Sequence, residues 1–231
     1  MSEATGAATN DVAPGPAAPF RSRYAAYTVD LALLAPIVLL LSLGPLARAR
    51  EALADLDAAM LEAFERMAPE ALASALALAD ALRTDAVFFD AVVAISAAIL
   101  GAVVQVLLTA LLIAALWFIG FEASGWQATP GKRALGLRVE TLGGARPSLW
   151  RAVLRFVAAG PSWLLLHLGH AMVSWRDDRR ALHDLVAGTR VSGPSRLPAW
   201  AWAYLALQGL AVLALLGQFV VNLIRVALIG Y

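Results

Sequence analysis

Long runs of apolar residues, separated by shorter polar stretches, dominate the pattern of this sequence. Two runs, at 24–43 and 200–229, are each long enough to cross a bilayer core of about 30 Å as a helix. A third apolar stretch covers 87–121, which is longer than a membrane needs, so we place its span at 101–121 and expect the residues before it to project beyond the membrane. The pattern therefore predicts an all-α membrane protein with three transmembrane helices.

A shorter apolar segment at 156–175 is harder to place. Gly160, Pro161 and Gly169 interrupt it, as in broken or re-entrant segments. The segment is long enough for one span, but one span would separate two basic loops that the positive-inside rule places on the same side. We expect a helical hairpin that dips into the cytoplasmic leaflet, with a fourth spanning helix as the alternative.

Residues 45–85 have a different pattern. Apolar side chains recur at helical spacing among acidic residues, and Pro69 suits the first position of a second helix. The segment is too charged to span, so we expect an extracytoplasmic amphipathic helical pair. Its apolar stripe suits either partner docking or the membrane surface, although its acidic face fits an anionic membrane poorly. The stripe consists of Leu53, Leu56, Met60 and Phe64.

Composition and charge support a multi-pass membrane protein. Of 231 residues, 61% are hydrophobic and only 15% are charged, whereas soluble domains carry about 25% charged residues. The net charge of +1 argues against a nucleic-acid partner. Basic residues gather in 122–151 and 176–196, which places these loops and the N-terminus in the cytoplasm. Residues 1–20 are rich in small residues and proline, so we expect a disordered tail.

Asp30 is an acidic residue inside the first predicted span. A carboxylate at the centre of a membrane helix costs about 2.5–3.5 kcal/mol, and less near the interface. Arg23 and Tyr27 share its helical face, but Arg23 lies two turns away, about 10 Å, so Asp30 is expected to pair with another segment. Asp30 is therefore either an ion site or a polar clamp between helices, and Arg23 is either part of that site or a positive-inside anchor.

The first basic loop, residues 122–151, contains a compact polar motif. Thr129 suits a helix N-cap, Pro130 the first helical position and Gly136 the helix end. Residues 137–142 then have the pattern of a short strand. The Gly-Lys pair inside the motif lacks the spacing and the hydroxyl residue of a phosphate-binding loop, so nucleotide binding is not expected.

The second basic loop contains another motif, at 176–192, for which we predict a helix. Asp178 suits its N-cap and Gly188 its C′ position. Arg180 and Asp184 stand four residues apart, where an exposed ion pair contributes only about 0.3–0.5 kcal/mol. The motif is therefore either a solvated, capped helix or part of a functional site.

The chain lacks the side-chain combinations that are typical of enzymes. It contains no zinc-protease motif, nucleophile elbow or calcium-loop spacing, and no cysteine. His167 and His170 share an apolar segment without a neighbouring carboxylate, which favours packed histidines over metal ligands. We therefore expect no enzymatic activity, no metal and no cofactor.

Three of these stretches together resemble the RDD family of bacterial integral membrane proteins, which is named for one arginine and two aspartates. Arg23, six intervening residues and Asp30 match its first motif. Thr-Pro-Gly-Lys at 129–132 with Leu-Gly-Leu-Arg-Val at 135–139 matches the second, and the sequence from His-Asp to Ala-Gly-Thr at 183–189 matches the third. Each motif alone is weak, but all three occur in order with hydrophobic spans between them.

The resemblance implies a protein of the bacterial cytoplasmic (inner) membrane with an RDD-like membrane domain over 21–192. The C-terminal transmembrane helix predicted from the apolar pattern follows it, within 193–231. The insert at 45–85 and this last span depart from the family pattern. The implied signature residues are Arg23, Asp30 and Asp184. Supporting candidates are Tyr27, Lys132, Arg138, Arg180 and His183.

The leading functional hypothesis is a small transporter, or a transport component, for protons or monovalent cations. In this hypothesis Asp30 binds the ion, Arg23 tunes its charge, and Asp184 with Arg180 closes the site. Asp30→Asn would then abolish flux and leave the fold intact. The alternative is a non-catalytic scaffold that works as a homo-oligomer or within a larger membrane complex, because three spans are few for a complete transport pathway.

Overall fold

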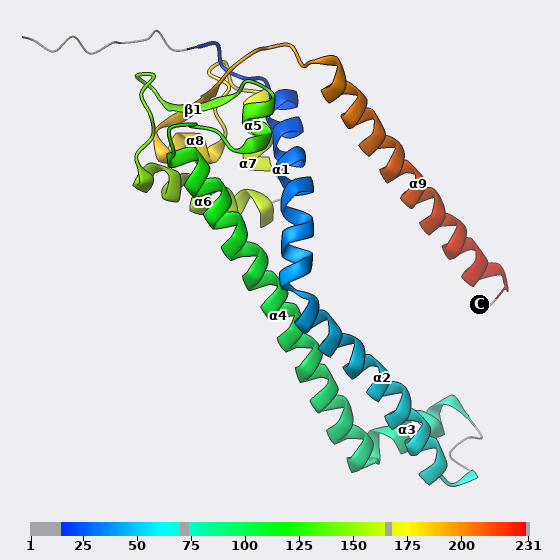
Figure 1. Cartoon of the computed structure of the whole chain (residues 1–231). Helices are drawn as coiled ribbons and strands as arrows, with labels where there is room; N and C mark the ends of the chain where they lie inside the picture. Colours follow the sequence, from blue (N-terminus) through cyan, green and yellow to red (C-terminus); the bar gives the residue numbers. More distant parts are fainter. Residues whose placement is uncertain (1–14, 70–73, 165–167, 230–231) are drawn as a thin grey trace, which may run out of the picture. The chain divides into compact units, whose positions relative to one another are not determined.

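The computed structural model describes residues 15–69, 74–164 and 168–229. The chain divides into two compact units (Figure 1). The motif unit comprises the chain up to Ala32 together with Leu116 onward, and the insert unit comprises Leu33–Ala115.

Three helices in the described part of the chain are long and apolar enough to cross a membrane: α1 (Phe20–Leu41), α4 (Ala86–Ala123) and α9 (Ala199–Ile229). The three predicted transmembrane helices are thereby confirmed by length and composition. Helix α4 has 38 residues, so the stretch before the predicted span at 101–121 belongs to the same helix.

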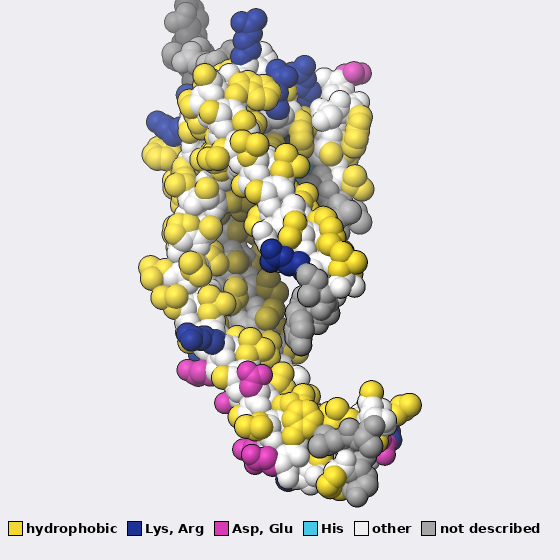
Figure 2. Space-filling view, turned by 90° about the vertical axis from the view of Figure 1, so that its right-hand side faces the viewer, with side chains coloured by type: hydrophobic (Ala, Val, Ile, Leu, Met, Phe, Trp, Pro, Cys, Tyr) yellow, Lys and Arg dark blue, Asp and Glu magenta, His cyan; other side chains and the backbone are white. Residues whose placement is uncertain are grey.

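The insert unit contains α2 (Leu43–Arg66), α3 (Ala75–Thr84) and the first part of α4. Helix α2 lies beside α4 (Figure 1), and Arg48 of α2 donates to the Oε1 atom of Gln105 in α4. Figure 2 shows acidic side chains interspersed with hydrophobic ones on this unit. The predicted apolar stripe is partly covered, with Leu53 and Phe64 exposed and Leu56 and Met60 half-buried.

The helix predicted to begin at Pro69 continues into residues outside the described chain, so it stays a prediction. Helix α3 begins at Ala75, and the Ser74 hydroxyl accepts a hydrogen bond from the Ala77 amide at 3.1 Å. Serine provides a side-chain acceptor for the free amides of a helix N-terminus, which a proline does not. Residues 70–73 lie outside the described residues.

The motif unit adds short helices and two strands to the ends of the long helices. Its elements are α5 (Pro130–Ala134), β1 (Arg138–Thr141), α6 (Leu149–Leu164), α7 (Leu168–Ala171), the 3₁₀ turn Met172–Ser174, α8 (Leu182–Ala187) and β2 (Thr189–Ser192). Strands β1 and β2 pair antiparallel, with Val139 opposite Val191. These two valines, with Leu135 and Leu137, belong to a core that also contains Ala18, Ala25, Ala26 and Ala201.

The helix predicted over 176–192 is wrong in its extent. Helix α8 covers only six residues, and Gly188 ends it with a left-handed φ of 63°. The chain then leaves the helix as strand β2, because Thr189 and Val191 are β-branched and β1 offers them a backbone partner. The strand predicted at 137–142 is present as β1.

The end of the N-terminal tail is ordered, contrary to the prediction for residues 1–20. Ala17 forms a β-bridge with Ser192, and the Ala18 amide donates to the Val191 carbonyl at 2.9 Å. The carbonyl of Gly15 accepts from Arg190. Residues 1–14 lie outside the described part.

The segment predicted as re-entrant or spanning, 156–175, is broken into α6, α7 and a 3₁₀ turn. Pro161 lies inside α6, and residues 165–167 lie outside the described chain. Gly169 of α7 packs so closely on Ser162 of α6 that a Cβ atom would collide with the serine side chain. None of these elements is among the three span-length helices, so a fourth span or a re-entrant hairpin remains a prediction.

Candidate functional site

Asp30 lies on α1 and is completely buried. Its Oδ1 accepts hydrogen bonds from the Gly131 amide at 2.8 Å and from the indole Nε1 of Trp117 at 3.1 Å. Its Oδ2 accepts from the Thr129 hydroxyl at 2.5 Å. All three donors come from other segments, so this carboxylate links α1 to α4 and to the N-terminus of α5.

The local sequence of α5 explains why the Asp30 carboxylate binds at the N-terminus of this helix. Thr129 is the N-cap, with its hydroxyl 3.4 Å from the Lys132 amide, and Pro130 occupies the first helical position. Gly131 lies against α1: a Cβ atom there would collide with the Ala26 carbonyl oxygen and lie 2.9 Å from the Asp30 carboxyl carbon. The Thr-Pro-Gly sequence therefore supplies two donors and the space for α1 to approach.

Asp184, on α8, is the second completely buried carboxylate. Its Oδ2 accepts from the Nη1 of Arg23 at 2.5 Å and from the Ala181 amide at 3.0 Å, and its Oδ1 pairs with Arg155. Arg23 also donates to the carbonyls of Ala18 and Arg179. Arg23 and Asp184, separated by 161 residues in the chain, thus form a direct ion pair.

The ion pairs continue from Asp184 through α6 to α4 and α5. The Nε of Arg155 lies 2.9 Å from Glu122 Oε2, and the Nζ of Lys132 lies 2.7 Å from Glu122 Oε1. Arg155 is 5% exposed, Glu122 4% and Lys132 9%. We call these five residues, Arg23, Asp184, Arg155, Glu122 and Lys132, the charged cluster.

Arg155 and Glu122 were missed by reasoning from the sequence. Glu122 was counted with the basic loop, and Arg155 precedes the segment examined for a membrane span. The signal was available: Glu122 directly follows an uninterrupted apolar run, and Arg155 stands between Leu154 and Phe156. Ionisable residues at such positions need a buried partner.

Two further expectations for the second motif are corrected by the geometry. Arg180 donates to the backbone carbonyls of Asp184 and Thr189, so it is not the partner of the Asp184 carboxylate. Asp178 does not cap a helix; its carboxylate pairs with Arg176 at 2.8 Å. The fold provides Arg23 and Arg155 as partners because α1 and α6 both meet the N-terminus of α8.

The remaining candidates from the sequence differ in whether they lie near the charged cluster. Arg138 is exposed at the start of β1 and lies outside the charged cluster. Tyr27 is half-buried, with its ring centroid 6.2 Å from that of Phe118. Both Tyr27 and His183 line a cavity next to the cluster.

His183 is a buried histidine beside the charged cluster. Its Nε2 lies 3.7 Å from Asp184 Oδ1, and its ring centroid lies 4.8 Å from that of His170. Burial, followed by the charges of Arg155, His170, Arg23 and Lys132, lowers the pKa of His183 well below its usual value of 6.5. The imidazole is therefore neutral at neutral pH.

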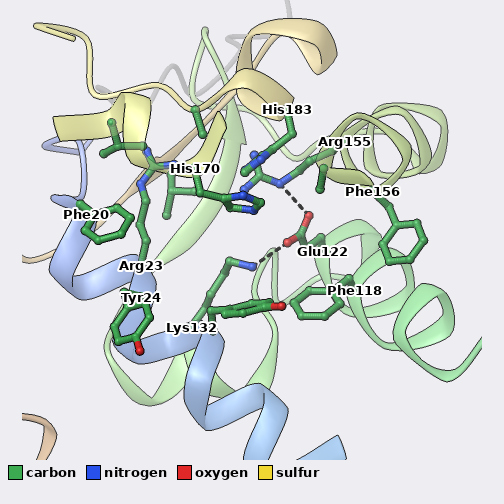
Figure 3. Close-up of a pocket in the computed structure, with 15 residues that line it drawn as sticks. Phe20, Arg23, Tyr24, Phe118, Glu122, Lys132, Arg155, Phe156, His170 and His183 are labelled. Atoms are coloured by element: carbon green, nitrogen blue, oxygen red, sulfur yellow. Dashed lines mark hydrogen bonds and ion pairs between the residues drawn. The ribbon is translucent and has the colours of Figure 1, made fainter. Parts of the chain in front are cut away.

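A cavity of about 210 Å³ opens between α1, the end of α4, α6 and α7 (Figure 3). Arg23, Glu122, Lys132 and Arg155 line its polar side, and aromatic and aliphatic side chains together with His170 and His183 line the rest. Within the described residues, no group of three or more His, Asp or Glu side chains is arranged to hold a metal ion.

The fold and this site define a class of protein: a helical membrane protein whose polar loops fold back on the ends of its spans around buried Arg–Asp contacts. The model of the RDD family matches residues 17–188, and the chain belongs to this family. The family resemblance inferred from the three motifs is thereby confirmed.

A curated relative, the uncharacterized protein YxaI of Bacillus subtilis (strain 168), is 35% identical over 69 residues. The match covers 30% of this chain and 45% of that protein, so the two share less than half of the relative's length. No solved structure matches this chain.

Proposed function

We propose that this RDD-family protein is a small, non-enzymatic component of a proton-coupled membrane transport process, and that protonation acts at Glu122. The observation that carries the proposal is the position of Glu122: its carboxylate is buried between Lys132 and Arg155 and lines the cavity. A proton reaching Glu122 through the cavity would release two cations at once. That change in charge is large enough to rearrange the contacts between α4, α5 and α6.

Asp30 is less suited to be the ion site than the sequence suggested. Both of its oxygens already accept hydrogen bonds, from Thr129, Gly131 and Trp117, and it is not among the residues that line the cavity. Three donors around one carboxylate favour the second sequence interpretation, a polar clamp between segments.

The charge balance of the cluster argues against an alkali-cation site. Three cations, Arg23, Lys132 and Arg155, face the two carboxylates of Glu122 and Asp184. A sodium or potassium ion would need several oxygen ligands and a surplus of negative charge, whereas a proton needs one reachable carboxylate.

Strand pairing supports a topology for the proposed component. Strand β1 pairs with β2, and Ala17 forms a bridge to Ser192, so these three points lie on the same side of a membrane. The segment between the two strands then crosses either twice or not at all, which favours the re-entrant arrangement for 156–175. The basic loops indicate that this side is the cytoplasm of the cell's inner membrane.

The direct test is proton flux in proteoliposomes that contain a pH-sensitive dye, with the wild type, Glu122→Gln and the exposed control Glu62→Gln. We expect the wild type and Glu62→Gln to move protons above empty liposomes and Glu122→Gln to lose at least nine-tenths of that flux. Equal flux in all three proteins would exclude Glu122 as the proton site. An absence of flux under proton, sodium and potassium gradients would leave the scaffold alternative.

One observation favours a scaffold function as a second candidate. In the amphipathic insert, Leu53 is 54% exposed and Phe64 is 37% exposed, so half of the apolar stripe is uncovered. A larger membrane complex, or a second copy of this chain, would cover it. Deleting residues 48–84 would separate the two functions: a lost complex with retained flux supports docking through the insert.

A further inference from the structure

Two chemically different sets of side chains line the cavity beside the charged cluster (Figure 3). One set is charged, and we call it the charged wall. The other set, which we call the aromatic wall, has five rings that belong to Phe20, Tyr24, Tyr27, Phe118 and Phe156, with aliphatic side chains beside them. A cavity of this kind fits a molecule that has one polar end and one apolar end.

The charged wall favours an anion. Arg23, Lys132 and Arg155 line it with only one carboxylate, that of Glu122. Asp184 pairs with both arginines of the cluster, and with it counted the cluster still has one positive charge more than negative. Lys132 uses one of its three N–H groups on Glu122. Its Nζ also lies 5.3 Å from the centroid of the Phe118 ring, which lines the cavity. The remaining N–H groups of Lys132 are therefore positioned to donate toward the cavity.

An unpaired nitrogen atom of His183 is an independent observation that points to a ligand. It lines the cavity, it is 7% exposed, and its Nδ1 has no hydrogen-bond partner among the residues that the structure describes. A buried polar atom without a partner costs about 1–3 kcal/mol, and a bound polar group would remove that cost.

The aromatic wall and the size of the cavity define the other end of the ligand. A volume of about 210 Å³ corresponds to roughly seven water molecules at 30 Å³ each. It accommodates a compact head and the first carbons of a chain, but not a whole lipid. Tyr24, which lines the cavity and is 46% exposed, marks a side where the rest of a chain can leave.

We propose that this cavity binds the head and proximal chain of an anionic amphiphile, in which a carboxylate or phosphate is attached to an alkyl chain. The head pairs with Lys132 and Arg155 and meets the Nδ1 of His183, and the chain runs along the aromatic wall. Such a molecule reaches the site from the bilayer or from solution. The proposed proton site shares this cavity and these cations, but binding needs no ion movement, so it is measured separately from proton flux.

The test is equilibrium binding of radiolabelled dodecanoate to the full-length protein in nanodiscs of zwitterionic lipid, corrected for binding to empty nanodiscs. Unlabelled dodecyl phosphate should compete. Dodecanol, which lacks the charge, and inorganic phosphate, which lacks the chain, should compete at least tenfold more weakly. Phospholipid with an anionic head, added to the nanodiscs, distinguishes a ligand from the bilayer from a ligand from solution. It should compete with dodecanoate if the head of a membrane lipid enters the cavity.

Two variants and one control locate the site. Lys132→Gln should weaken dodecanoate binding at least tenfold, while Arg155 continues to pair with Glu122. Arg133→Gln is the matched control, because Arg133 is exposed and lies 4.4 Å over the Trp126 ring, outside the cavity. Ala159→Leu fills the cavity from α6 and should also abolish binding, which keeps the test decisive if Lys132→Gln does not fold.

Three results would overturn the proposal. Inorganic phosphate that competes as well as dodecyl phosphate would define a site for small anions only. Dodecanol that competes as well as dodecanoate would show partitioning without recognition of the head. Dodecanoate binding that survives Ala159→Leu would place the amphiphile elsewhere on the protein.

Discussion

At the scale of single residues, two buried aspartates have different environments. Asp30 is surrounded by neutral donors, whereas Asp184 is surrounded by two arginines. A carboxylate held by neutral donors ties segments together, and one held by cations is part of a network whose charge state matters. The same residue type therefore has a structural role in one motif and an electrostatic role in the other.

Replacement of Asp30 by asparagine should destabilise the motif unit. The asparagine amide turns an acceptor into a donor in front of Thr129, Gly131 or Trp117, which leaves at least one buried donor unpaired at a cost of about 1–3 kcal/mol. Thermal unfolding in detergent would measure this loss. Asp90→Asn, at an exposed position of α4, is the control. An unchanged melting temperature together with lost flux would instead restore Asp30 as the ion site.

Gly131→Ala should destabilise the contact between α1 and α5 in which Asp30 takes part. The added methyl group meets the Ala26 carbonyl and the Asp30 carboxyl, both part of the α1 contact, so α5 must move away. Overpacking of this kind costs about 1–3 kcal/mol. Gly143→Ala, where a Cβ meets open space, should change little in the same unfolding measurement. Equal melting temperatures for both variants would show that α5 is not held against α1.

His183 should make the protein less stable in mild acid. The pKa of its imidazole is lowered in the folded protein, whereas the unfolded chain binds a proton near the usual pH of 6.5. The unfolded state therefore binds more protons below that pH, and the free energy of unfolding falls as the pH drops. Melting curves between pH 8 and pH 5 would measure it, and His183→Gln should show a smaller loss over that interval. Parallel curves for the two proteins would contradict this assignment.

At the scale of elements, short segments with little core of their own depend on the ion pairs that join them. Helix α8 has six residues and α5 has five, fewer than an isolated helix needs for stability. Contacts of Asp184 with α1 and α6, and of Lys132 with α4, connect them to longer helices. Stability of these elements is therefore tertiary in origin.

Asp184→Asn should disrupt this part of the fold, and Asp177→Asn should not. Removing the charge of Asp184 leaves Arg23 and Arg155 beside each other without their shared carboxylate, and breaking a buried pair costs about 3–5 kcal/mol. Asp177 is exposed and outside the charged cluster. Limited proteolysis and thermal unfolding would compare the two variants. Similar behaviour would mean that the buried pair contributes little.

At the scale of the whole molecule, three span-length helices and two paired strands restrict how the chain crosses a membrane. The strands and the bridge at Ala17 hold the N-terminal end of α1 and both basic loops together. Helix α9 has none of its apolar window buried, so it is free to face lipid or a partner.

Cysteine labelling tests this topology in a chain that has no native cysteine. Gly143→Cys and Ser195→Cys should react with a membrane-impermeant thiol reagent from the same side, and Asp57→Cys from the other. The reason is that the first two positions flank the paired strands and the third lies in the insert. Labelling of 143 and 195 from opposite sides would establish a single span at 156–175 and contradict the β1–β2 pairing.

The sequence by itself determined the membrane class, the three long helices, the RDD family and the short elements at Thr129 and Gly188. These features depend on local composition, on hydrophobic run length and on capping residues, which can be read without knowing the fold. The motif spacing also singled out Arg23, Asp30 and Asp184 as candidates.

The tertiary structure alone decided which of these residues meet. Arg23 pairs with Asp184 rather than with Asp30, and Arg155 joins the network from a helix that contains no family motif. Residues 189–192, the end of the segment predicted as a helix, form strand β2. Ion pairs between residues far apart in the sequence, and strands that form only when a partner strand is present, have no local signal. Their geometry follows from how the motif unit packs, which no single segment encodes.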